Sequence, residues 1–297
     1  MGVPDGIHTV LVTPFDAAGA LDPGALRAHV DWLLEAGVHA LIPGGTTGEF
    51  YAQAVAERAK VLEVVSDAAA GRVPLLAGVN ATHPGETIEL ARYARDLGYV
   101  GVLLAPPPYS LPTPDDLERH VRRVAEVGLD IVLYNFPART GVDLSTVFLR
   151  RLVDVEQVVA IKESSGSLTK LHELVVDLGN RFAPVCGADD QALEFFLWGA
   201  RAWVAGASNF LPRAHVRLYE TCVVRGDVAA GRELMTLLLP LFSLLEGEGR
   251  YVQYVKAGTE AAGFAVGAPR PPLAPLTAGE RARLDALVDA LRAHDLV

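Results

Sequence analysis

The sequence alternates between short apolar runs and longer amphipathic segments, and this pattern repeats eight times. Most of the short runs are continuously apolar, which is typical of strands buried on both faces of a parallel sheet. The predicted strands are Thr9–Phe15, His39–Gly44, Val73–Val79, Val100–Ala105, Ile131–Phe136, Val158–Lys162, Phe182–Cys186 and Ala202–Ala207. The segments between them have apolar residues at helical spacing: Pro23–Leu34, Ala54–Ala70, Gly85–Leu97, Pro114–Val127, Leu144–Leu152, Leu168–Leu178 and Gln191–Leu197.

Eight strand-then-helix units predict an α/β fold, a closed (β/α)₈ TIM barrel, with an open doubly wound sheet as the structural alternative. Asp22 and Thr113 each precede a proline, which is the pattern of an N-cap followed by proline in the first helical turn. Residues 212–294 predict several further helices, of which the barrel needs one. We therefore expect a barrel over residues 1–225 and a C-terminal helical extension packed on it over residues 226–297, with the proline-rich loop Gly267–Pro275 before the last helix.

Composition excludes several classes of function. The chain has 36 acidic and 26 basic residues and a net charge of −10, which argues against nucleic acid or an anionic membrane as a partner. The first ten residues lack the basic start and apolar run of a signal peptide, and the most apolar stretch, Met235–Leu245, is shorter than the roughly 20 residues of a membrane span. We expect a soluble cytoplasmic protein.

Cofactor motifs are not found in the sequence. The eight histidines form no HxH or HExxH motif, and the two cysteines form no CxxC. There is also no GxGxxG after a predicted strand and no phosphate-binding GxxxxGK[ST]. We therefore expect no metal and no nucleotide cofactor.

Polar residues follow six of the predicted strands directly. In a parallel barrel the carboxyl ends of the strands form one rim, where catalytic groups gather. The rim segments are Gly44–Glu49, Pro106–Tyr109, Tyr134–Gly141, Lys162–Ser165, Cys186–Asp190 and Gly206–Asn209, of which Gly206 and Ala207 end the predicted eighth strand. Gly187 and Ala207 are expected to line a substrate site at this rim.

Lys162 is the sharpest chemical signal at the rim. The chain has 22 arginines and only four lysines, and Lys162 alone follows an apolar strand-like run, Val-Val-Ala-Ile. A buried amine loses its proton more readily than an arginine does, and a neutral amine attacks a carbonyl to form a Schiff base. The alternative is a lysine that reaches water at the strand end or pairs with a carboxylate.

Tyr134 ends the strand that precedes the Lys162 strand. Neighbouring strands lie about 4.8 Å apart, so a phenol at this position is within reach of the Lys162 amine. Schiff-base formation moves protons on and off a carbinolamine, and a phenol can relay them. The alternative is a buried tyrosine whose hydroxyl group bonds a backbone carbonyl.

Other rim residues suggest anion binding. The Gly44–Glu49 turn offers backbone N–H groups and the hydroxyls of Thr46 and Thr47, which suit a carboxylate or phosphate, although a tight turn is the alternative. Arg139 is suited to bind a second carboxylate, or else pairs with an acid on the surface. Asp189 and Asp190 are interpreted as a helix N-cap rather than a metal site. Tyr109 has no role that the residues alone define.

Together these residues resemble the dihydrodipicolinate synthase and N-acetylneuraminate lyase family of Schiff-base aldolases and lyases. The marks are Gly45-Thr46-Thr47-Gly48-Glu49, Tyr134-Asn135-x-Pro137 and Ile161-Lys162-Glu163, in order and at barrel spacing. The resemblance implies that Lys162 forms an imine with pyruvate or a related 2-oxo acid. It also implies that Tyr134 relays protons, that Thr46 and Thr47 contact the 2-oxo acid carboxylate and the relay, and that Tyr109 comes from a neighbouring subunit of a homotetramer.

Some residues match the synthase branch of the family, and others depart from it. The Tyr134–Gly141 segment resembles the synthase branch, in which the arginine binds the carboxylate of aspartate semialdehyde. The chain departs from that branch at Pro108-Tyr109, where two tyrosines are usual, and at Val55, where lysine-regulated members have histidine. It departs again at Tyr251-Val-Gln-Tyr-Val-Lys256, in place of Asn-Pro-x-Pro-x-Lys. These departures argue against feedback inhibition by lysine.

Three alternatives to a synthase remain. A sugar-acid aldolase or dehydratase, or an amino-acid-catabolic lyase, would use the same imine. A binding protein on the same barrel would hold a 2-oxo acid without turnover. A metal-dependent aldolase is a further alternative that the histidine spacing does not favour.

Overall fold

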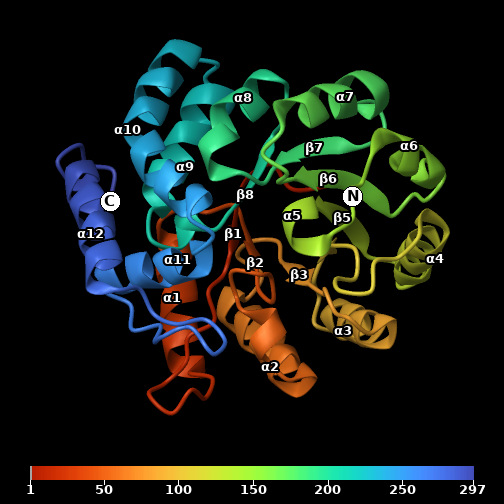
Figure 1. The fold of residues 1–297 in the computed structure, drawn as a ribbon, viewed down its shortest axis with the longest axis horizontal. Helices are drawn as coiled ribbons and strands as arrows, with labels where there is room; N and C mark the ends of the chain where they lie inside the picture. Colours follow the sequence, from red (N-terminus) through yellow and green to blue (C-terminus); the bar gives the residue numbers. More distant parts are fainter. Residues whose placement is uncertain (1) are drawn as a thin grey trace.

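The computed structural model describes residues 2–297 and shows eight parallel strands surrounded by helices (Figure 1). The strands are β1 Gly6–Val10, β2 Ala40–Ile42, β3 Leu76–Gly78, β4 Gly101–Leu104, β5 Asp130–Asn135, β6 Val158–Glu163, β7 Ala183–Cys186 and β8 Ala202–Ala205. Their order in the sheet is β2-β1-β8-β7-β6-β5-β4-β3, so each strand lies beside its neighbours in sequence and β8 returns to β1.

The seam between β2 and β3 closes the sheet into a barrel. Leu41 and Leu75 form a parallel bridge, and the Gly78 N–H donates to the Pro43 carbonyl at 2.8 Å. Gly44 and Gly78 meet here so closely that a Cβ on Gly78 would lie 2.4 Å from the Gly44 carbonyl oxygen. The predicted closed barrel is therefore confirmed, and the open doubly wound sheet is wrong.

Helices follow the strands and form the outer layer of the barrel. They are α1 Pro23–Glu35, α2 Val55–Ala69, α3 Pro84–Asp96, α4 Pro114–Ala125, α5 Pro137–Thr140, α6 Thr146–Leu149, α7 Leu168–Leu178, α8 Ala192–Leu197 and α9 Pro212–Tyr219. Short 3₁₀ turns lie at Phe50–Ala52, Arg150–Leu152, Asp189–Gln191 and Ala207–Asn209, and a π-helical turn at Glu220–Val224 follows α9.

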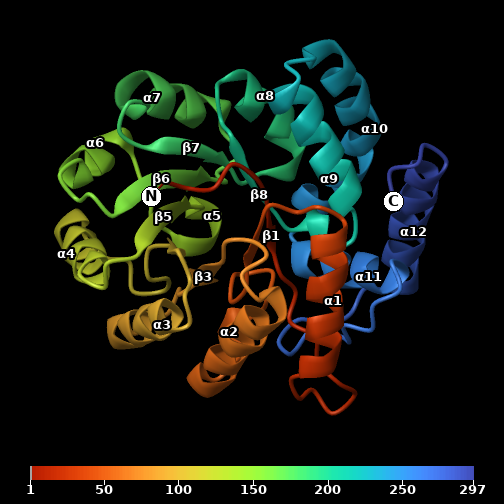
Figure 2. The same cartoon turned by 180° about the vertical axis from the view of Figure 1, so that it is seen from behind.

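Three further helices form the C-terminal extension: α10 Val228–Gly247, α11 Tyr251–Ala261 and α12 Ala278–Arg292. They lie on one side of the barrel, beside α1 and α9, as the front and back views show (Figures 1 and 2). The predicted proline-rich loop does separate α11 from α12. α10 starts just after the expected boundary at residue 226, but the extension does not have a core of its own. Most of its buried apolar residues belong to one cluster with Ile7 of β1 and Trp203 of β8.

Two helix starts behave as the sequence predicts. The Asp22 carboxylate accepts from the Ala25 N–H at 2.9 Å, and the Thr113 hydroxyl accepts from the Asp116 N–H at 3.2 Å. Each cap satisfies an N–H group that the first helical turn leaves without a backbone partner. Both capping predictions are therefore confirmed.

The first strand is the main error in the predicted elements. We expected Thr9–Phe15, whereas β1 ends at Val10. Beyond it the Val12 N–H donates to Asn209 Oδ1 at 3.0 Å, and the Phe15 N–H donates to the Val266 carbonyl at 3.0 Å. The segment is apolar because it is buried near residues of the C-terminal half of the chain, and this burial gives the same sequence pattern as a strand.

The segment after β5 also differs from the prediction. Residues 137–140, for which no helix or strand was predicted, form the short helix α5, with Pro137 in its first turn and Gly141 at φ +71° as its C-cap. The predicted helix Leu144–Leu152 is confirmed in position, but its second half is a 3₁₀ turn.

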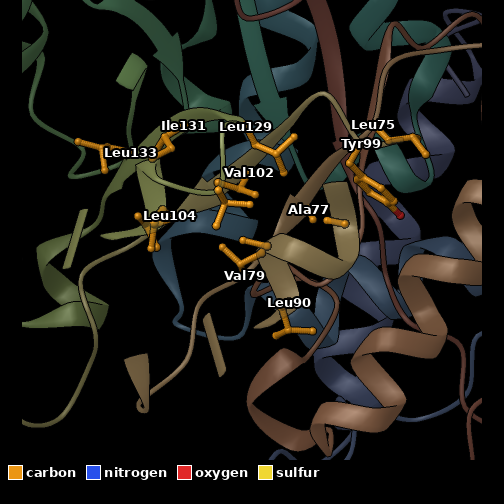
Figure 3. Close-up of a cluster of buried hydrophobic side chains, with 14 of the residues drawn as sticks. Leu75, Ala77, Val79, Leu90, Tyr99, Val102, Leu104, Leu129, Ile131 and Leu133 are labelled. Atoms are coloured by element: carbon orange, nitrogen blue, oxygen red, sulfur yellow. The ribbon is translucent and has the colours of Figure 1, made fainter. Parts of the chain in front are cut away.

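Alternation along the strands separates two apolar layers. Val132 and Tyr134 of β5 belong to a cluster inside the barrel, whereas Ile131 and Leu133 belong to the layer between the strands and the outer helices. Figure 3 shows part of this outer layer, where Ile131 and Leu133 lie near Val102 and Leu104 of β4. Because successive side chains of a strand point to opposite faces, a residue's position along the strand decides whether it faces the interior.

α10 is long and apolar enough to cross a bilayer by length and composition alone, and a third of its most apolar window is buried inside the protein. The core helix of a soluble protein passes the same test. Met235, Leu238, Leu241 and Phe242 of α10 are buried in the cluster shared with the barrel.

Candidate active site

A narrow pocket opens at the carboxyl ends of the strands. It is lined by Val10, Thr46, Thr47, Leu103, Tyr134, Phe136, Arg139, Lys162, Gly187, Val204, Gly206, Glu246 and Tyr251. A cavity of about 320 Å³ adjoins it and shares Thr46, Tyr134, Arg139 and Tyr251 with its wall. Five of the six predicted rim segments therefore contribute to this pocket, whereas Pro106 and Pro108 of the sixth line only the adjoining cavity.

Strand register places Lys162 beside Tyr134. The two residues are directly paired between β6 and β5, and alternation turns both toward the barrel interior, with Ala160 and Val132 below them. The Lys162 Nζ lies 4.2 Å from the centre of the Tyr134 ring. The amine and the phenol therefore line the same pocket from neighbouring strands.

Burial makes Lys162 an unusual lysine. Its side chain is 7% exposed, and the loss of hydration, reinforced by the positive charge of Arg139, lowers its pKa to about 8. The other three lysines each form an ion pair: Lys60 with Glu63, Lys170 with Asp143, and Lys256 with Glu49. Within residues 2–297, no carboxylate forms such a pair with Lys162. A lysine of this kind holds a neutral amine at mildly alkaline pH.

Tyr134 is also buried, at 5% exposure, and burial raises the pKa of its hydroxyl. Ser164 and Thr46 are its side-chain hydrogen-bonding neighbours. A neutral phenol in contact with another hydroxyl is able both to donate and to accept a proton, which is what a relay requires.

The Gly44–Glu49 turn brings both threonines to the pocket. Thr46 and Thr47 line it, and Gly45 allows the close approach, because a Cβ there would lie 2.5 Å from Val10 Cγ1. Glu49 does not face the pocket. It is fully buried at φ +58°, and it pairs with Lys256 at 2.8 Å.

Gly187 provides the space next to the amine. A Cβ at this position would lie 2.0 Å from Ser164 Oγ and 2.7 Å from Lys162 Cε. Ala207 is placed differently from our expectation. It is fully buried, its N–H points to Asp189 Oδ2 at 3.4 Å, and its neighbour Gly206 lines the pocket in its place.

Arg139 lies on α5 at the pocket mouth, with its guanidinium group 4.6 Å from the centre of the Phe136 ring. It lines both the pocket and the adjoining cavity. Within residues 2–297 no carboxylate forms an ion pair with it. The alternative of a surface arginine paired with an acid is therefore not what the structure shows.

Tyr109 lies outside the pocket within one chain. Its side chain is 95% exposed, and its backbone is in the left-handed region at φ +79°. It lines neither the pocket nor the adjoining cavity. A role in this site would have to come from a neighbouring subunit.

Sequence reasoning misinterpreted Asp189, which lies behind the pocket wall, and missed two polar residues that line the pocket, Glu246 and Tyr251. Asp189 is not a helix N-cap: its carboxylate accepts from Trp203 Nε1 at 3.0 Å and from the Tyr251 hydroxyl at 2.5 Å. Glu246, at the end of α10, and Tyr251, at the start of α11, come from the extension. The unusual Tyr251–Lys256 segment was the available signal for Tyr251, whereas nothing local marked Glu246.

Within the described part of the chain, residues 2–297, no three His, Cys, Asp or Glu side chains lie together as a group able to hold a metal ion.

Comparison with known proteins decides the family. The model of the dihydrodipicolinate synthetase family matches residues 3–291. The chain belongs to this family. It is 39% identical over 280 residues to a 4-hydroxy-tetrahydrodipicolinate synthase of Thermomicrobium roseum, covering 94% of this chain and 92% of the relative.

Solved structures agree with this assignment. The 4-hydroxy-tetrahydrodipicolinate synthase of Methylacidiphilum fumariolicum superposes with a TM-score of 0.92 at 30% identity, covering 97% of this chain and 96% of that one. YagE of Escherichia coli, a prophage protein of the same family crystallised with pyruvate, gives 0.91 at 31% identity, covering 97% and 98%. The chain is thus an enzyme of a Schiff-base lyase family, of the class I aldolase type, and the predicted family and fold are confirmed.

Proposed function

We propose that the protein forms an imine between Lys162 and pyruvate or a related 2-oxo acid and then makes or breaks a carbon–carbon bond with an aldehyde. One observation carries the proposal: the only buried lysine without an ion-pair partner in residues 2–297 lies in a pocket 4.2 Å from a buried tyrosine ring. The Lys162 amine is itself the nucleophile, so imine formation needs no metal or nucleotide.

Imine formation uses the groups at the bottom of the pocket. The neutral Lys162 amine attacks the keto carbon, and the keto oxygen takes up a proton to give a carbinolamine. The nitrogen loses one proton as the carbinolamine forms. A second proton on the oxygen lets it leave as water, and the nitrogen lone pair then forms the protonated imine. Tyr134, in contact with Thr46, relays these protons.

The remaining rim residues hold the two substrates. Thr46 and Thr47 bind the 2-oxo acid carboxylate, and Gly187 leaves room for the imine carbon next to Lys162. Loss of a proton from C3 gives an enamine, which attacks the aldehyde carbon. Arg139, without an ion-pair partner at the pocket mouth, binds a carboxylate on the aldehyde, and aspartate semialdehyde is the first candidate.

A second candidate rests on the extension. The Tyr251–Lys256 segment departs from the synthase pattern, and Tyr251 lines the pocket directly. Because this part of the pocket wall differs from that of the synthases, the pocket could accept a different second substrate. Cleavage or dehydration of a 2-oxo-3-deoxy acid is therefore the alternative activity. Assays with aspartate semialdehyde and with a series of 2-oxo-3-deoxy acids separate the two.

We also propose that the protein is a soluble, cytoplasmic homotetramer. Tyr109 is almost fully exposed, and its backbone lies in the left-handed region. Contacts from a neighbouring subunit would cover this side chain and hold this strained conformation, which supports an oligomer. Sedimentation velocity tests the assembly, and a monomer at micromolar concentration would contradict it.

The imine itself is tested by borohydride reduction in the presence of pyruvate. We expect one reduced pyruvyl group per chain by mass spectrometry, located on the peptide that contains Lys162. Lys60→Ala, which removes an exposed lysine on α2, is the matched control and should label fully. If Lys162→Ala labels as well as the wild type, the proposal is wrong. Pyruvate binding by an unlabelled wild type would favour a binding protein.

A further inference from the structure

The C-terminal extension contributes a carboxyl group to the pocket that no family motif described above includes. Glu246, in the last turn of α10, lines the same pocket as Lys162, Tyr134 and Arg139. Its single hydrogen bond within residues 2–297 joins Oε1 to the Asp189 N–H at 3.1 Å. The other oxygen, Oε2, has no protein partner there. The carboxyl group therefore has one oxygen available for a ligand.

Asp189, the neighbouring acid, is held in a different way. Burial raises the pKa of Asp189, but its carboxylate accepts from Trp203 Nε1, from the Tyr251 hydroxyl and from the Ala207 N–H, and these three donors oppose that shift by stabilising the anion. Tyr251 is itself fixed, because its oxygen also accepts from the Gly206 N–H at 3.1 Å. When two carboxyl groups lie together in a poorly hydrated site, the one with fewer donors keeps its proton. Here that group is Glu246.

The charges around Glu246 support the same assignment. Burial, followed by the negative charge of Asp189, raises the pKa of Glu246 to about 8. The groups whose charges act in this region come from six elements: Asp189 and Asp190 of the turn before α8, Arg139 of α5, Lys162 of β6, Tyr134 of β5, Cys186 of β7 and Tyr251 of α11. Arg139 favours the anion, but it lies at the mouth and does not pair with Glu246.

We propose that Glu246 is the acid that protonates the aldehyde oxygen during carbon–carbon bond formation, a step that rests on the imine chemistry proposed above. The enamine carbon attacks the aldehyde carbon, the C=O electron pair moves to the aldehyde oxygen, and that oxygen takes the proton of Glu246. A hydroxyl group results, and Glu246 is left as a carboxylate that regains a proton from water. In cleavage, the carboxylate takes the hydroxyl proton back.

This assignment divides the proton transfers between two sides of the pocket. Tyr134 and Thr46, on β5 and after β2, serve the imine, whereas Glu246, on the extension, serves the second substrate. The two steps are measurable separately: borohydride trapping and exchange of the pyruvate methyl protons in D₂O report the imine and enamine without any aldehyde. Carbon–carbon chemistry is followed with pyruvate plus aspartate semialdehyde, and by release of pyruvate from 4-hydroxy-2-oxopentanoate.

The test compares Glu246→Gln with Glu233→Gln, a substitution of an exposed residue on the same helix. Glutamine keeps the size of the side chain but does not act as an acid. We expect imine trapping and methyl exchange within about threefold of wild type, and kcat for the carbon–carbon step lower by about 100-fold or more. The wild-type rate should fall above about pH 8, where Glu246 loses its proton, and this limb should be missing in Glu246→Gln.

Each other outcome overturns the inference. A carbon–carbon rate in Glu246→Gln within about threefold of wild type contradicts the acid role, and an equal loss in both assays shows a structural effect instead. A wild type that traps the imine but converts neither compound contradicts the inference and leaves the imine proposal intact. A wild type that traps no imine contradicts both. A loss of carbon–carbon activity in Glu233→Gln as large as that in Glu246→Gln would also overturn it, because Glu233 lies outside the pocket.

Discussion

Glu49 and Lys256 form an ion pair of 2.8 Å between two side chains that are no more than 1% exposed. Lys256 also donates to the carbonyls of Thr13 and Ala268, and Glu49 Oε2 accepts from the Arg270 N–H at 2.7 Å. The pair therefore ties α11 and the proline-rich loop to the turn that presents Thr46 and Thr47. It couples the position of the extension to the substrate end of the barrel.

Breaking this pair should destabilise the protein strongly. In Lys256→Met the Glu49 carboxylate stays buried without its partner, and we expect the free energy of unfolding to fall by about 3–5 kcal/mol. Urea unfolding measures the loss. Lys60→Met breaks an exposed pair and should cost about 1 kcal/mol or less. The double variant Glu49→Gln/Lys256→Met should recover part of the loss, and no recovery would mean that packing alone explains it.

The rate of imine formation should depend on the ionisation of Lys162. Only the neutral amine attacks, so the rate of borohydride-trapped imine formation with pyruvate should rise with pH and level off above about pH 8. Arg139→Gln removes a positive charge that lowers the Lys162 pKa, so the rising limb should move to higher pH. A limb at the same pH in both proteins would show that Arg139 does not act on this amine.

Loss of the Tyr134 hydroxyl should slow imine formation while leaving the fold intact. We expect Tyr134→Phe to lower the single-turnover rate of imine formation by about 10²–10⁴-fold, the usual contribution of a positioned acid–base group. Tyr99→Phe is the matched control, because Tyr99 is also buried, but its hydroxyl donates to the Leu62 carbonyl away from the pocket. Equal rates in the two variants would remove Tyr134 from the relay.

A side chain at Gly187 should displace the amine. The new Cβ of Gly187→Ala would overlap Ser164 Oγ and crowd Lys162 Cε, so we expect loss of imine trapping and weaker pyruvate binding. Gly279→Ala adds a Cβ on α12 with nothing within 4 Å, so full activity is expected there, with unchanged or slightly higher thermal stability. Normal trapping by Gly187→Ala would show that the pocket adapts freely.

The repeating pattern of the chain was sufficient for the barrel and for the lysine–tyrosine pair. Both depend on local regularity: continuous apolar runs indicate buried strands, and the alternation of side chains decides which residues face inward. Tyr134 and Lys162 end neighbouring strands, so their proximity follows once the barrel is assumed. The same reasoning failed for Leu11–Phe15, because burial away from the sheet gives the same apolar pattern as a strand.

Only the tertiary structure decided the roles of residues that lie far apart in the chain. Asp189 was interpreted as a helix cap because nothing near it in sequence shows that Trp203 and Tyr251 donate to its carboxylate. Nothing in the local sequence distinguishes Glu246 from any other acid near a helix end; only the folded extension places it half-buried in the pocket wall beside Asp189. Local sequence determines which way a side chain points along its own strand or helix. The partners, burial and pKa of a side chain depend on which distant segments the completed core brings against it.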